Sequence, residues 1–359
     1  MSKRLMIMAG GTGGHVFPGL AVADYLAIRG WQIHWLGTRD RMEARLVPQA
    51  GYPISYLTIS GVRGHGLLRK LGAPFAILRA IWQAARAQRT FKPDVVLGMG
   101  GFASGPGGIA AWLRGTPLVI HEQNAVPGMT NKLLSRLAKK VLTGFDQTFS
   151  GPADEKFQWV GNPVRQTIFE IQRQPIGDRP IRLLIIGGSL GAQALNEKLP
   201  VALASFSGIE VRHQCGGGRK AQVSAEYQRR MSAGVVWQVE EFIQDMTSAY
   251  AWADLIICRA GALTVAEVAA SGLAAVFVPL PHAVDDHQSR NAQILVDGGA
   301  AIMAPQSSLA TEEFKLRIQQ LLERPDDLLK MGAAAREMAR PDATAQVAEC
   351  CKQMTELQA

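Results

Sequence analysis

The chain has 359 residues, of which 47% are apolar and 19% are charged, a composition typical of a folded globular protein and not of a disordered or fibrous one. Because single hydrophobic cores tend to divide above roughly 250–300 residues, this length predicts two domains. The 38 Lys and Arg residues outnumber the 30 Asp and Glu residues, which leaves a net charge of +8. The excess favours an anionic partner such as nucleic acid, a phosphorylated ligand or anionic lipid.

The four cysteines predict neither a structural zinc site nor a disulfide framework, since they form no C-x-x-C pair and no histidine stands at zinc-finger spacing. A reducing cytoplasm fits this pattern. No stretch approaches the roughly 18–20 apolar residues of a transmembrane helix. The apolar run at residues 5–9 is shorter than the core of a signal peptide. Any contact with a membrane is therefore expected to be peripheral.

Two segments along the chain share one pattern of a short apolar run, a glycine-rich turn and an apolar helix. The first joins Leu5–Ala9 to Gly10–Gly14, and the second joins Leu183–Ile186 to Gly187–Gly191. Each indicates a buried strand, a glycine turn and a helix, which together open a parallel α/β sheet. Two such units about half a chain apart predict two doubly wound domains in tandem.

Other short apolar runs fit this arrangement as strands: residues 33–36, 95–97, 118–121, 140–142, 211–214, 235–238, 255–258 and 275–278. The turn Gly161-Asn162-Pro163 marks the expected boundary. It gives an N-terminal domain of residues 1–162 and a C-terminal domain of residues 163–340. A last helix is expected near residues 344–357, and the segment 341–359 could pack on either domain, including back on the first.

Three glycine-rich loops follow predicted strands, at Gly10–Gly14, Gly100–Gly108 and Gly187–Gly191. Without a Cβ atom the backbone can approach an anion closely, and the N-terminus of the following helix presents N–H groups and partial positive charge. Many such loops only turn the chain, but three at strand ends favour phosphate binding. None matches the dinucleotide fingerprint, because the first lacks the third glycine of G-x-G-x-x-G, and no G-K-[ST] of a P-loop occurs.

The segment Cys258–Glu267 predicts a strand end, a glycine turn and a helix whose second turn carries Glu267. A carboxylate there can accept hydrogen bonds from both hydroxyls of a ribose, while Thr264 and the first-turn N–H groups can meet a phosphate. The alternative is an acidic side chain that only complements the helix dipole.

A basic helix is predicted at residues 67–89, interrupted at Gly72-Ala73-Pro74, within a region from Ala44 to Pro93 that contains no acidic residue. At about 100° per residue, one face is aromatic and cationic: Phe75, Arg79, Trp82, Arg86 and Arg89. The other face is aliphatic and suits the domain core: Ile77, Leu78, Ile81 and Ala85. The first face suits anionic lipid headgroups, the alternative being a solvated face with Trp82 folded inward. Nucleic acid is not expected, because no known nucleic-acid module occurs.

Five motifs stand in a fixed order along the chain: Gly10–His15, His121–Asn124, Gly161–Arg165, Gly187–Gly191 and Gly261–Glu267. In this order they resemble the motifs of the MurG family of bacterial N-acetylglucosaminyl transferases, which act in peptidoglycan synthesis. The resemblance covers nearly the whole chain. It implies a GT-B fold, in which two Rossmann-like doubly wound domains of parallel sheet face each other across a cleft.

The resemblance also implies the reaction. An inverting transferase would move GlcNAc from UDP-GlcNAc to the 4-hydroxyl of MurNAc in undecaprenyl-pyrophosphoryl-MurNAc-pentapeptide (lipid I), which gives lipid II with a β-1,4 linkage. The N-terminal domain would bind the lipid acceptor and an anionic membrane surface, and the C-terminal domain would bind the donor. The enzyme would lie peripherally on the cytoplasmic face of the inner membrane, where other cell-wall and division proteins are further partners.

Donor contacts carry over residue by residue. Ser189 would lie at the diphosphate, Ile243 would touch uracil through its backbone, and Gln288 would hold the sugar with Asn291. Ribose and phosphate contacts fall on one segment: Ala262, Leu263, Thr264, Val265, Ala266 and Glu267. From the N-terminal half of the chain, the residues that would contact the donor are Thr12, Gly13, Gly14 and Asn124. Arg165 would contribute from the hinge.

The reaction needs a base for the acceptor hydroxyl and charge stabilisation for the departing UDP. His15 suits the base, because an imidazole ordinarily titrates near neutrality, and Glu122 is its rival. The alternative for His15 is a residue at a helix start that only hydrogen-bonds the loop. Helix dipoles and backbone N–H groups, with Arg259, would stabilise UDP, so that neither an essential metal nor a cofactor is expected. Two other functions stay open: a UDP-sugar epimerase or hydrolase on the same fold, and a non-catalytic membrane scaffold.

Overall fold

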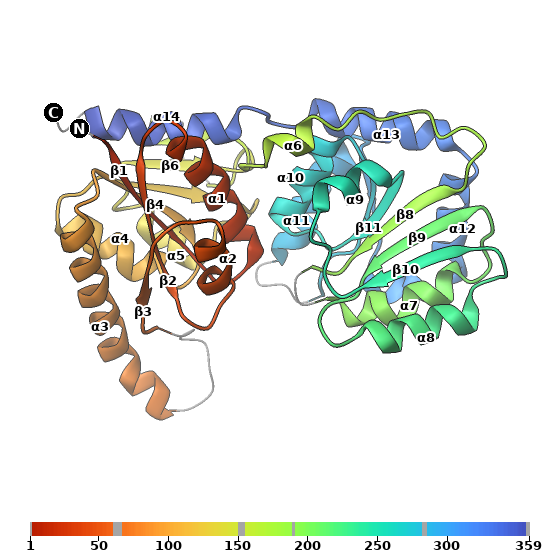
Figure 1. Cartoon of the computed structure of the whole chain (residues 1–359), viewed down its shortest axis with the longest axis horizontal. Helices are drawn as coiled ribbons and strands as arrows, with labels where there is room; N and C mark the ends of the chain where they lie inside the picture. Colours follow the sequence, from red (N-terminus) through yellow and green to blue (C-terminus); the bar gives the residue numbers. More distant parts are fainter. Residues whose placement is uncertain (1, 60–66, 150–154, 189–190, 282–285, 357–359) are drawn as a thin grey trace. The chain divides into compact units, whose positions relative to one another are not determined.

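The computed structural model describes residues 2–59, 67–149, 155–188, 191–281 and 286–356. The chain divides into two compact units, one formed by residues 1–164 with residues 342–359 and the other by residues 165–341. Each unit contains one sheet of parallel strands with helices packed against it (Figure 1).

The first unit has, within its described residues, a seven-stranded sheet in the order β3-β2-β1-β4-β5-β6-β7. Its strands are β1 Arg4–Ala9, β2 Gln32–Thr38, β3 Ile54–Leu57, β4 Val95–Gly100, β5 Leu118–Glu122, β6 Lys140–Thr143 and β7 Phe157–Trp159. Its helices are α1 Gly13–Ala27, α2 Glu43–Gln49, α3 Leu67–Phe91, α4 Ser104–Leu113, α5 Met129–Leu134 and α14 Ala343–Glu356.

Strand β1 shows why this sheet is covered on both faces. Leu5 and Ile7 join one buried apolar cluster, which includes residues of α1 and α14. Met6 and Met8 join a second cluster, which includes residues of α3 and α4. Successive side chains of a strand point to opposite faces, so a continuous apolar run fills two cores, as parallel sheets require.

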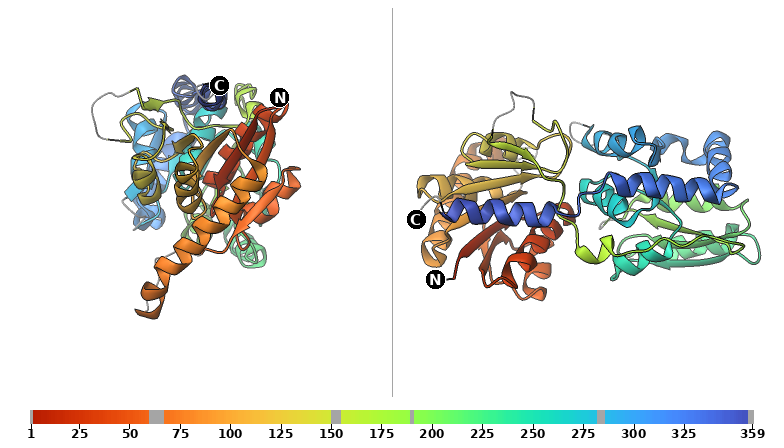
Figure 2. Two further views of the ribbon diagram at one scale, coloured as in Figure 1. Left: turned by 90° about the vertical axis from the view of Figure 1, so that its left-hand side faces the viewer. Right: turned by 90° about the horizontal axis from the view of Figure 1, so that it is seen from above.

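Helix α14 belongs to the first unit, although the whole second unit lies before it in the sequence. Its buried residues Val347, Cys351 and Met354 enter the same cluster as Leu5 and Ile7. The helix packs against α1 and β4 (Figure 2). The last segment of the chain therefore completes the core on one face of the first sheet.

The second unit has a six-stranded parallel sheet in the order β10-β9-β8-β11-β12-β13 across its described residues. Its strands are β8 Ile181–Ile186, β9 Ile209–Gln214, β10 Val236–Glu240, β11 Leu255–Cys258, β12 Ala274–Phe277 and β13 Ala301–Met303. Its helices are α6 Gln166–Phe169, α7 Gln193–Leu203, α8 Lys220–Arg230, α9 Met246–Trp252, α10 Ala262–Ser271, α11 His287–Asp297, the 3-10 helix η2 Gln306–Ala310, α12 Glu312–Leu322 and α13 Pro325–Glu337.

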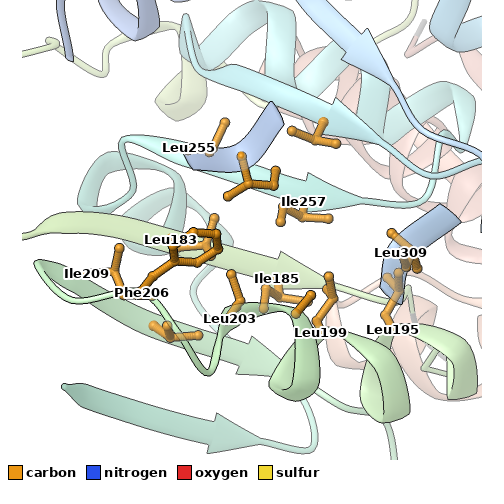
Figure 3. Close-up of a cluster of buried hydrophobic side chains, with 14 of the residues drawn as sticks. Leu183, Ile185, Leu195, Leu199, Leu203, Phe206, Ile209, Leu255, Ile257 and Leu309 are labelled. Atoms are coloured by element: carbon orange, nitrogen blue, oxygen red, sulfur yellow. The ribbon is translucent and has the colours of Figure 1, made fainter. Parts of the chain in front are cut away.

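The core of the second unit forms between the sheet and helix α7. Leu183 and Ile185 of β8 and Ile257 of β11 lie among the leucines of α7 (Figure 3). These leucines are Leu195, Leu199 and Leu203, which recur at four-residue spacing on one side of the helix. The spacing matches the helical repeat, so one apolar stripe faces the sheet.

The strands predicted from buried apolar runs are all present, in both units. Strands β3, β7 and β13 were not predicted. Strand β7 has exposed side chains throughout, so it lacks the continuous apolar run of a strand covered on both faces. Strands β3 and β13 are only four and three residues long, which is too short for a clear pattern.

Helix α3 runs without interruption from Leu67 to Phe91, so the predicted break at Gly72-Ala73-Pro74 is wrong. A proline within a helix removes one backbone hydrogen bond, and here the helix continues through it. The N-terminal part of α3 extends past the sheet (Figure 2). Among the helices that the structure describes, none is both long enough and apolar enough to cross a bilayer.

Candidate active site

The strand orders locate a candidate site in each unit. In the first sheet β1 lies beside β4, with β2 and β5 outside them, and in the second β8 lies beside β11 in the same way. At such a switch point the chain leaves adjacent strands toward opposite faces, and ligands of doubly wound sheets bind at the carboxyl ends of those strands. The glycine loops that follow β1, β4 and β8 stand at these two points.

The first two glycine loops touch each other through their backbones. Gly101 has a φ of +83°, and a Cβ atom there would collide with the carbonyl oxygen of Gly10. The buried Ser104 hydroxyl accepts a hydrogen bond from the Gly100 N–H at 3.0 Å and lies 2.9 Å from the Met8 carbonyl oxygen. Only glycine permits this approach. The close packing of the two loops is therefore by itself a reason for glycine at these positions.

The predicted residues Thr12, Gly13 and Gly14 open helix α1. Thr12 is the N-cap residue, and its carbonyl accepts the N–H groups of His15 at 3.1 Å and Val16 at 3.2 Å. The first N–H groups of a helix have no partner within the helix and carry the positive end of its dipole. The loop therefore presents the positive end of the helix dipole beside the His15 side chain.

His15 is half-buried, and a hydrogen bond orients its ring. Its Nδ1 lies 3.1 Å from the carbonyl oxygen of Gly10. A carbonyl oxygen only accepts, so Nδ1 carries the proton and Nε2 is the basic nitrogen of the neutral ring. A Cβ atom on Gly100 would lie 3.0 Å from Nε2, so the ring packs on the second glycine loop. The ring is thus held in the tautomer that a base acting through Nε2 needs.

Glu122, the rival base, is buried, and donors surround its carboxylate. Oε1 accepts the backbone and side-chain N–H groups of Asn124 at 3.0 and 3.1 Å. Oε2 accepts the Gly128 N–H at 3.0 Å and the Asn131 side chain at 2.9 Å. Four hydrogen bonds to one carboxylate fix the loop that follows β5, and with it the predicted residue Asn124.

His121 joins the same strand end to the turn at Gly161. Its Nε2 lies 2.9 Å from the Gly161 carbonyl oxygen, and its Nδ1 lies 3.1 Å from Nε2 of Gln123. Burial lowers the pKa of His121 to about 4, despite the hydrogen bond to Gly161. The ring is therefore neutral near pH 7, where it donates to the turn and accepts from Gln123.

In the second unit, Glu267 lies on the second turn of α10 and is buried. Its Oε2 accepts the hydroxyl of Tyr250 at 2.9 Å, and its Oε1 lies 3.7 Å from Nη2 of Arg165. Burial raises the pKa of Glu267, while Arg165 and the Tyr250 hydroxyl oppose this shift. The structure thus brings Arg165 and Glu267 together and buries the carboxylate, unlike a solvated acid that only complements a helix dipole.

The remaining residues predicted to bind the donor follow β10, β11 and β12 in the chain. Gln288 accepts the Leu280 N–H at 2.9 Å, and Asn291 donates to the Ala260 carbonyl at 3.1 Å. Ile243 is buried after β10. In the predicted ribose and phosphate segment, three residues are buried and two are half-buried: Ala262, Leu263 and Val265, then Thr264 and Ala266.

The guanidinium of Arg259 points toward the protein's own backbone. It donates to the carbonyl groups of Val278 at 3.0 Å and Pro279 at 3.1 Å, and to the Gln306 side chain at 2.6 Å. Burial lowers its pKa. The side chain therefore braces the end of β12 in this structure.

Ser189 lies outside the described residues, but the flanks of its loop are described. A Cβ atom on Gly191, which has a φ of +71°, would collide with the Cys215 carbonyl oxygen. Gln214 donates to the Gly188 carbonyl at 3.1 Å. Gly188 and Gly191 therefore lie against the end of β9.

Two side chains at these sites were not predicted, Glu43 and Tyr250. Glu43 is the first residue of α2, where an acid has the ordinary role of complementing a helix dipole. Its side chain is instead fully buried against the first glycine loop. Tyr250 stands 17 residues before its partner Glu267. No local pattern signals either contact.

Helix α3 carries the predicted membrane residues on an exposed face. Phe75 is 76% exposed and Trp82 61% exposed, so the alternative in which Trp82 folds inward is wrong. Arg79 and Arg86 are also exposed, and the Arg86 guanidinium lies 5.8 Å from the Trp82 ring centroid. Leu78 was predicted to face the core and is 63% exposed, because three residues of helix place it only about 60° from Phe75.

Two parallel-sheet Rossmann-like domains in tandem, with glycine loops at both switch points, define the GT-B fold class. Residues 5–143 match the N-terminal domain of glycosyltransferase family 28, and residues 182–347 match its C-terminal domain. The chain is 58% identical, over 357 residues, to the UDP-N-acetylglucosamine--N-acetylmuramyl-(pentapeptide) pyrophosphoryl-undecaprenol N-acetylglucosamine transferase of Aeromonas hydrophila subsp. hydrophila. That match covers 99% of this chain and 98% of the relative.

The crystal structure of Acinetobacter baumannii MurG superposes with a TM-score of 0.81 at 45% identity, over 98% of this chain and 99% of that one. The chain therefore belongs to the MurG family of N-acetylglucosaminyltransferases, within glycosyltransferase family 28. A UDP-GlcNAc 2-epimerase from Neisseria meningitidis shares the fold, with a TM-score of 0.67 at 15% identity over 99% and 100% of the two chains. The predicted family, GT-B class and transferase activity are confirmed, and the likeness to the epimerase shows the fold alone.

Proposed function

We propose that this chain transfers GlcNAc from UDP-GlcNAc to the MurNAc 4-hydroxyl of lipid I, and so makes lipid II with a β-1,4 linkage. The observation that carries the proposal is the near-full-length match to a transferase whose name states both substrates. Attack by the hydroxyl opposite an α-linked leaving group inverts the anomeric carbon. The 4-hydroxyl oxygen bonds to C1, the C1–O bond to the diphosphate breaks, and the electron pair leaves with UDP.

His15 is the proposed general base. The hydroxyl proton passes to Nε2, which is basic when Nδ1 donates to the Gly10 carbonyl. Glu122 is less suited, because its four hydrogen bonds hold a loop and protonation would disrupt them. We assign Glu122 a positioning role for Asn124.

The second unit is the proposed donor domain. We assign Glu267 to the ribose hydroxyls, with Tyr250 and Arg165 fixing its carboxylate. The N-terminus of α10 and the loop with Ser189 would hold the diphosphate, Ile243 the uracil and Gln288 the sugar. From the first unit the donor would meet the residues Thr12, Gly13, Gly14 and Asn124.

Charge on the departing UDP is proposed to be stabilised by helix N-termini and backbone N–H groups. Within the described ranges, no group of three or more His, Cys, Asp or Glu side chains could hold a metal ion. Because these backbone groups are proposed to carry the charge, we expect transfer to persist when divalent ions are chelated.

The first unit is the proposed acceptor domain, and α3 its membrane face. The exposed residues Phe75, Leu78 and Trp82 offer apolar contact beside the cations Arg79 and Arg86. Helix α4, which packs on α3, adds exposed apolar residues at its end: Trp112 and Leu113. We propose that this surface binds anionic lipid peripherally, on the cytoplasmic face of the inner membrane, where the acceptor is presented.

The decisive experiment incubates the purified protein with UDP-GlcNAc and a lipid I analogue in the presence of EDTA. Formation of the disaccharide product with release of UDP is the expected result. Isomerisation of UDP-GlcNAc without acceptor would instead indicate an epimerase. Unchanged lipid II formation after His15→Ala and Glu267→Ala would indicate a scaffold, and loss of transfer with EDTA would contradict the charge-stabilisation argument.

A further inference from the structure

Glu43 places a carboxylate in the interior of the first unit, close to the first glycine loop. Glu43 is 0% exposed. Burying a carboxylate costs free energy of folding unless hydrogen-bond donors satisfy its oxygens. Oε1 accepts the backbone N–H and the hydroxyl of Thr38 at 3.0 and 2.6 Å. Oε2 accepts the backbone N–H of Gly11 at 3.0 Å. The carboxylate thus joins the end of β2 to the loop after β1.

Two glycines leave room for this side chain, Gly37 on β2 and Gly10 in the loop after β1. A Cβ atom on Gly37 would lie 2.7 Å from Cγ of Glu43, and a Cβ atom on Gly10 would collide with its carboxylate. The side chain therefore fits between two chain segments that only glycine brings so close. Such a fit fixes where the carboxylate lies.

One peptide group connects Glu43 to His15. The N–H of Gly11 and the C=O of Gly10 belong to the same planar unit, and in a trans peptide they point in opposite directions. Glu43 binds the N–H end, and Nδ1 of His15 binds the C=O end at 3.1 Å. The orientation of this peptide therefore decides whether a C=O or an N–H faces Nδ1, which also lies 3.5 Å from the Thr12 hydroxyl.

Without Glu43 the N–H end of this peptide would lose its described partner, and only the contacts of the Gly10 carbonyl with His15 and Gly101 would oppose its rotation. Gly11 has a φ of +93°, and a peptide between two glycines can rotate into several conformations at small cost. In the rotated state an N–H in place of the C=O would face Nδ1, which would then accept and leave the proton on Nε2. A ring in that tautomer cannot take a proton through Nε2.

We infer that Glu43 is a positioning residue: by holding the Gly10–Gly11 peptide, it fixes the orientation and tautomer of His15. This inference rests on the proposed role of His15 as the base. Glu43 touches neither reacting group and acts through the peptide.

The test compares Glu43→Gln, His15→Gln and the double variant in steady-state transfer assays over a range of pH. A glutamine keeps the shape of Glu43 but places an amide N–H₂ among three donors. Misplacement of a catalytic group costs on the order of 100-fold in rate, and we expect a fall in kcat of that size for Glu43→Gln, with little change in KM for UDP-GlcNAc. In the double variant, loss of Glu43 should add little to loss of His15, because both act on one proton transfer.

Thr38→Val is the matched control, since it removes the hydroxyl from the same carboxylate and leaves the contact with Gly11 in place. It should lower stability and leave kcat within a few-fold of the wild type. Nitrogen NMR of the seven histidines, with the His15 signals assigned by their loss in His15→Gln, should show the Nε2–H tautomer gaining population in Glu43→Gln alone.

The outcomes separate the two proposals. Wild-type activity in His15→Gln would overturn the base assignment, and the inference about Glu43 with it. An inactive His15→Gln beside a fully active Glu43→Gln would overturn only the inference about Glu43. The same conclusion would follow if the two losses multiplied in the double variant, or if the His15 tautomer did not change.

Discussion

Tyr250→Phe tests the buried carboxylate assigned to the donor ribose. The substitution removes one hydroxyl and keeps the ring, so the packing of α9 against α10 is retained. What is lost is the 2.9 Å hydrogen bond to Oε2 of Glu267. Both residues are buried, so water cannot easily replace the donor.

The expected cost follows from the charge of the acceptor. A hydrogen bond to a charged group contributes about 1.5–3 kcal/mol, against about 0.5–1.5 kcal/mol for a neutral pair. Tyr227→Phe supplies the neutral comparison within the same unit, because the buried Tyr227 hydroxyl lies 3.0 Å from Nδ1 of His213. Burial lowers the pKa of His213 to about 3, so that ring is neutral at ordinary pH. Tyr250→Phe should therefore lower the free energy of unfolding more than Tyr227→Phe.

The two variants should also differ in their dependence on pH. The folded-state pKa of Glu267 is raised, so its contribution to stability is fully present below the unfolded pKa, ordinarily about 4.3. That contribution is lost as the pH rises through the folded pKa. The Tyr250 hydroxyl opposes the shift, so its removal should raise the pKa of Glu267 further and enlarge the loss. Tyr227→Phe should leave the pH dependence unchanged.

Urea unfolding between pH 4 and pH 8 measures both effects, and calorimetry with UDP measures the consequence for binding. We expect weaker UDP binding in Tyr250→Phe and unchanged binding in Tyr227→Phe. Equal losses of stability in the two variants, with parallel pH profiles, would refute the reasoning about a charged acceptor. Normal UDP binding by Glu267→Gln would refute the ribose assignment itself.

Three further predictions concern the first unit. His15→Gln should lower the rate of transfer by about 10²–10⁴-fold, as loss of a general base does, while calorimetry shows UDP binding retained; a fully active variant would contradict the base assignment. Trp82→Glu should abolish sedimentation with vesicles of anionic lipid and leave UDP binding intact. The control Leu316→Glu, at an exposed apolar residue of α12, should not change sedimentation, and equal behaviour of the two variants would argue against a membrane face on α3. Gly101→Ala should lower the free energy of unfolding, measured in urea, by more than Gly30→Ala. Both positions have positive φ, which strains alanine by about 1–3 kcal/mol, but only Gly101→Ala adds a collision. Equal losses would mean that the two glycine loops can separate.

Much of the fold was predictable because parallel strands covered on both faces are continuous apolar runs. The run at Leu5–Ala9 signals β1 without any knowledge of its neighbours. Strand β7 gives no such signal, since its three residues are exposed. On α3, the helical repeat correctly placed Phe75 and Trp82 on the exposed face. Leu78 was assigned to the core face because it is apolar, although its angular position puts it on the same side of the helix as Phe75.

The site was predictable only where the chemistry is local. Glycine loops are visible in the sequence because positive φ and close backbone approach demand glycine. Contacts between distant residues are not, and Glu43 meets Gly11 from 32 residues away. Glu122 illustrates the same limit, because its residue type suits a base and only the fold reveals the donors that occupy it.

Helix α14 has a consequence for how the polypeptide is made. A ribosome releases residues 343–356 only after the entire second unit has emerged, yet Val347 and Met354 fill the core beneath β1. Domains made during translation usually fold in order of synthesis. Here helix α1 alone can cover its part of that face of the sheet, and the remaining apolar surface stays exposed until α14 is synthesised. Nascent chains stalled before residue 342 should therefore be the ones that recruit chaperones.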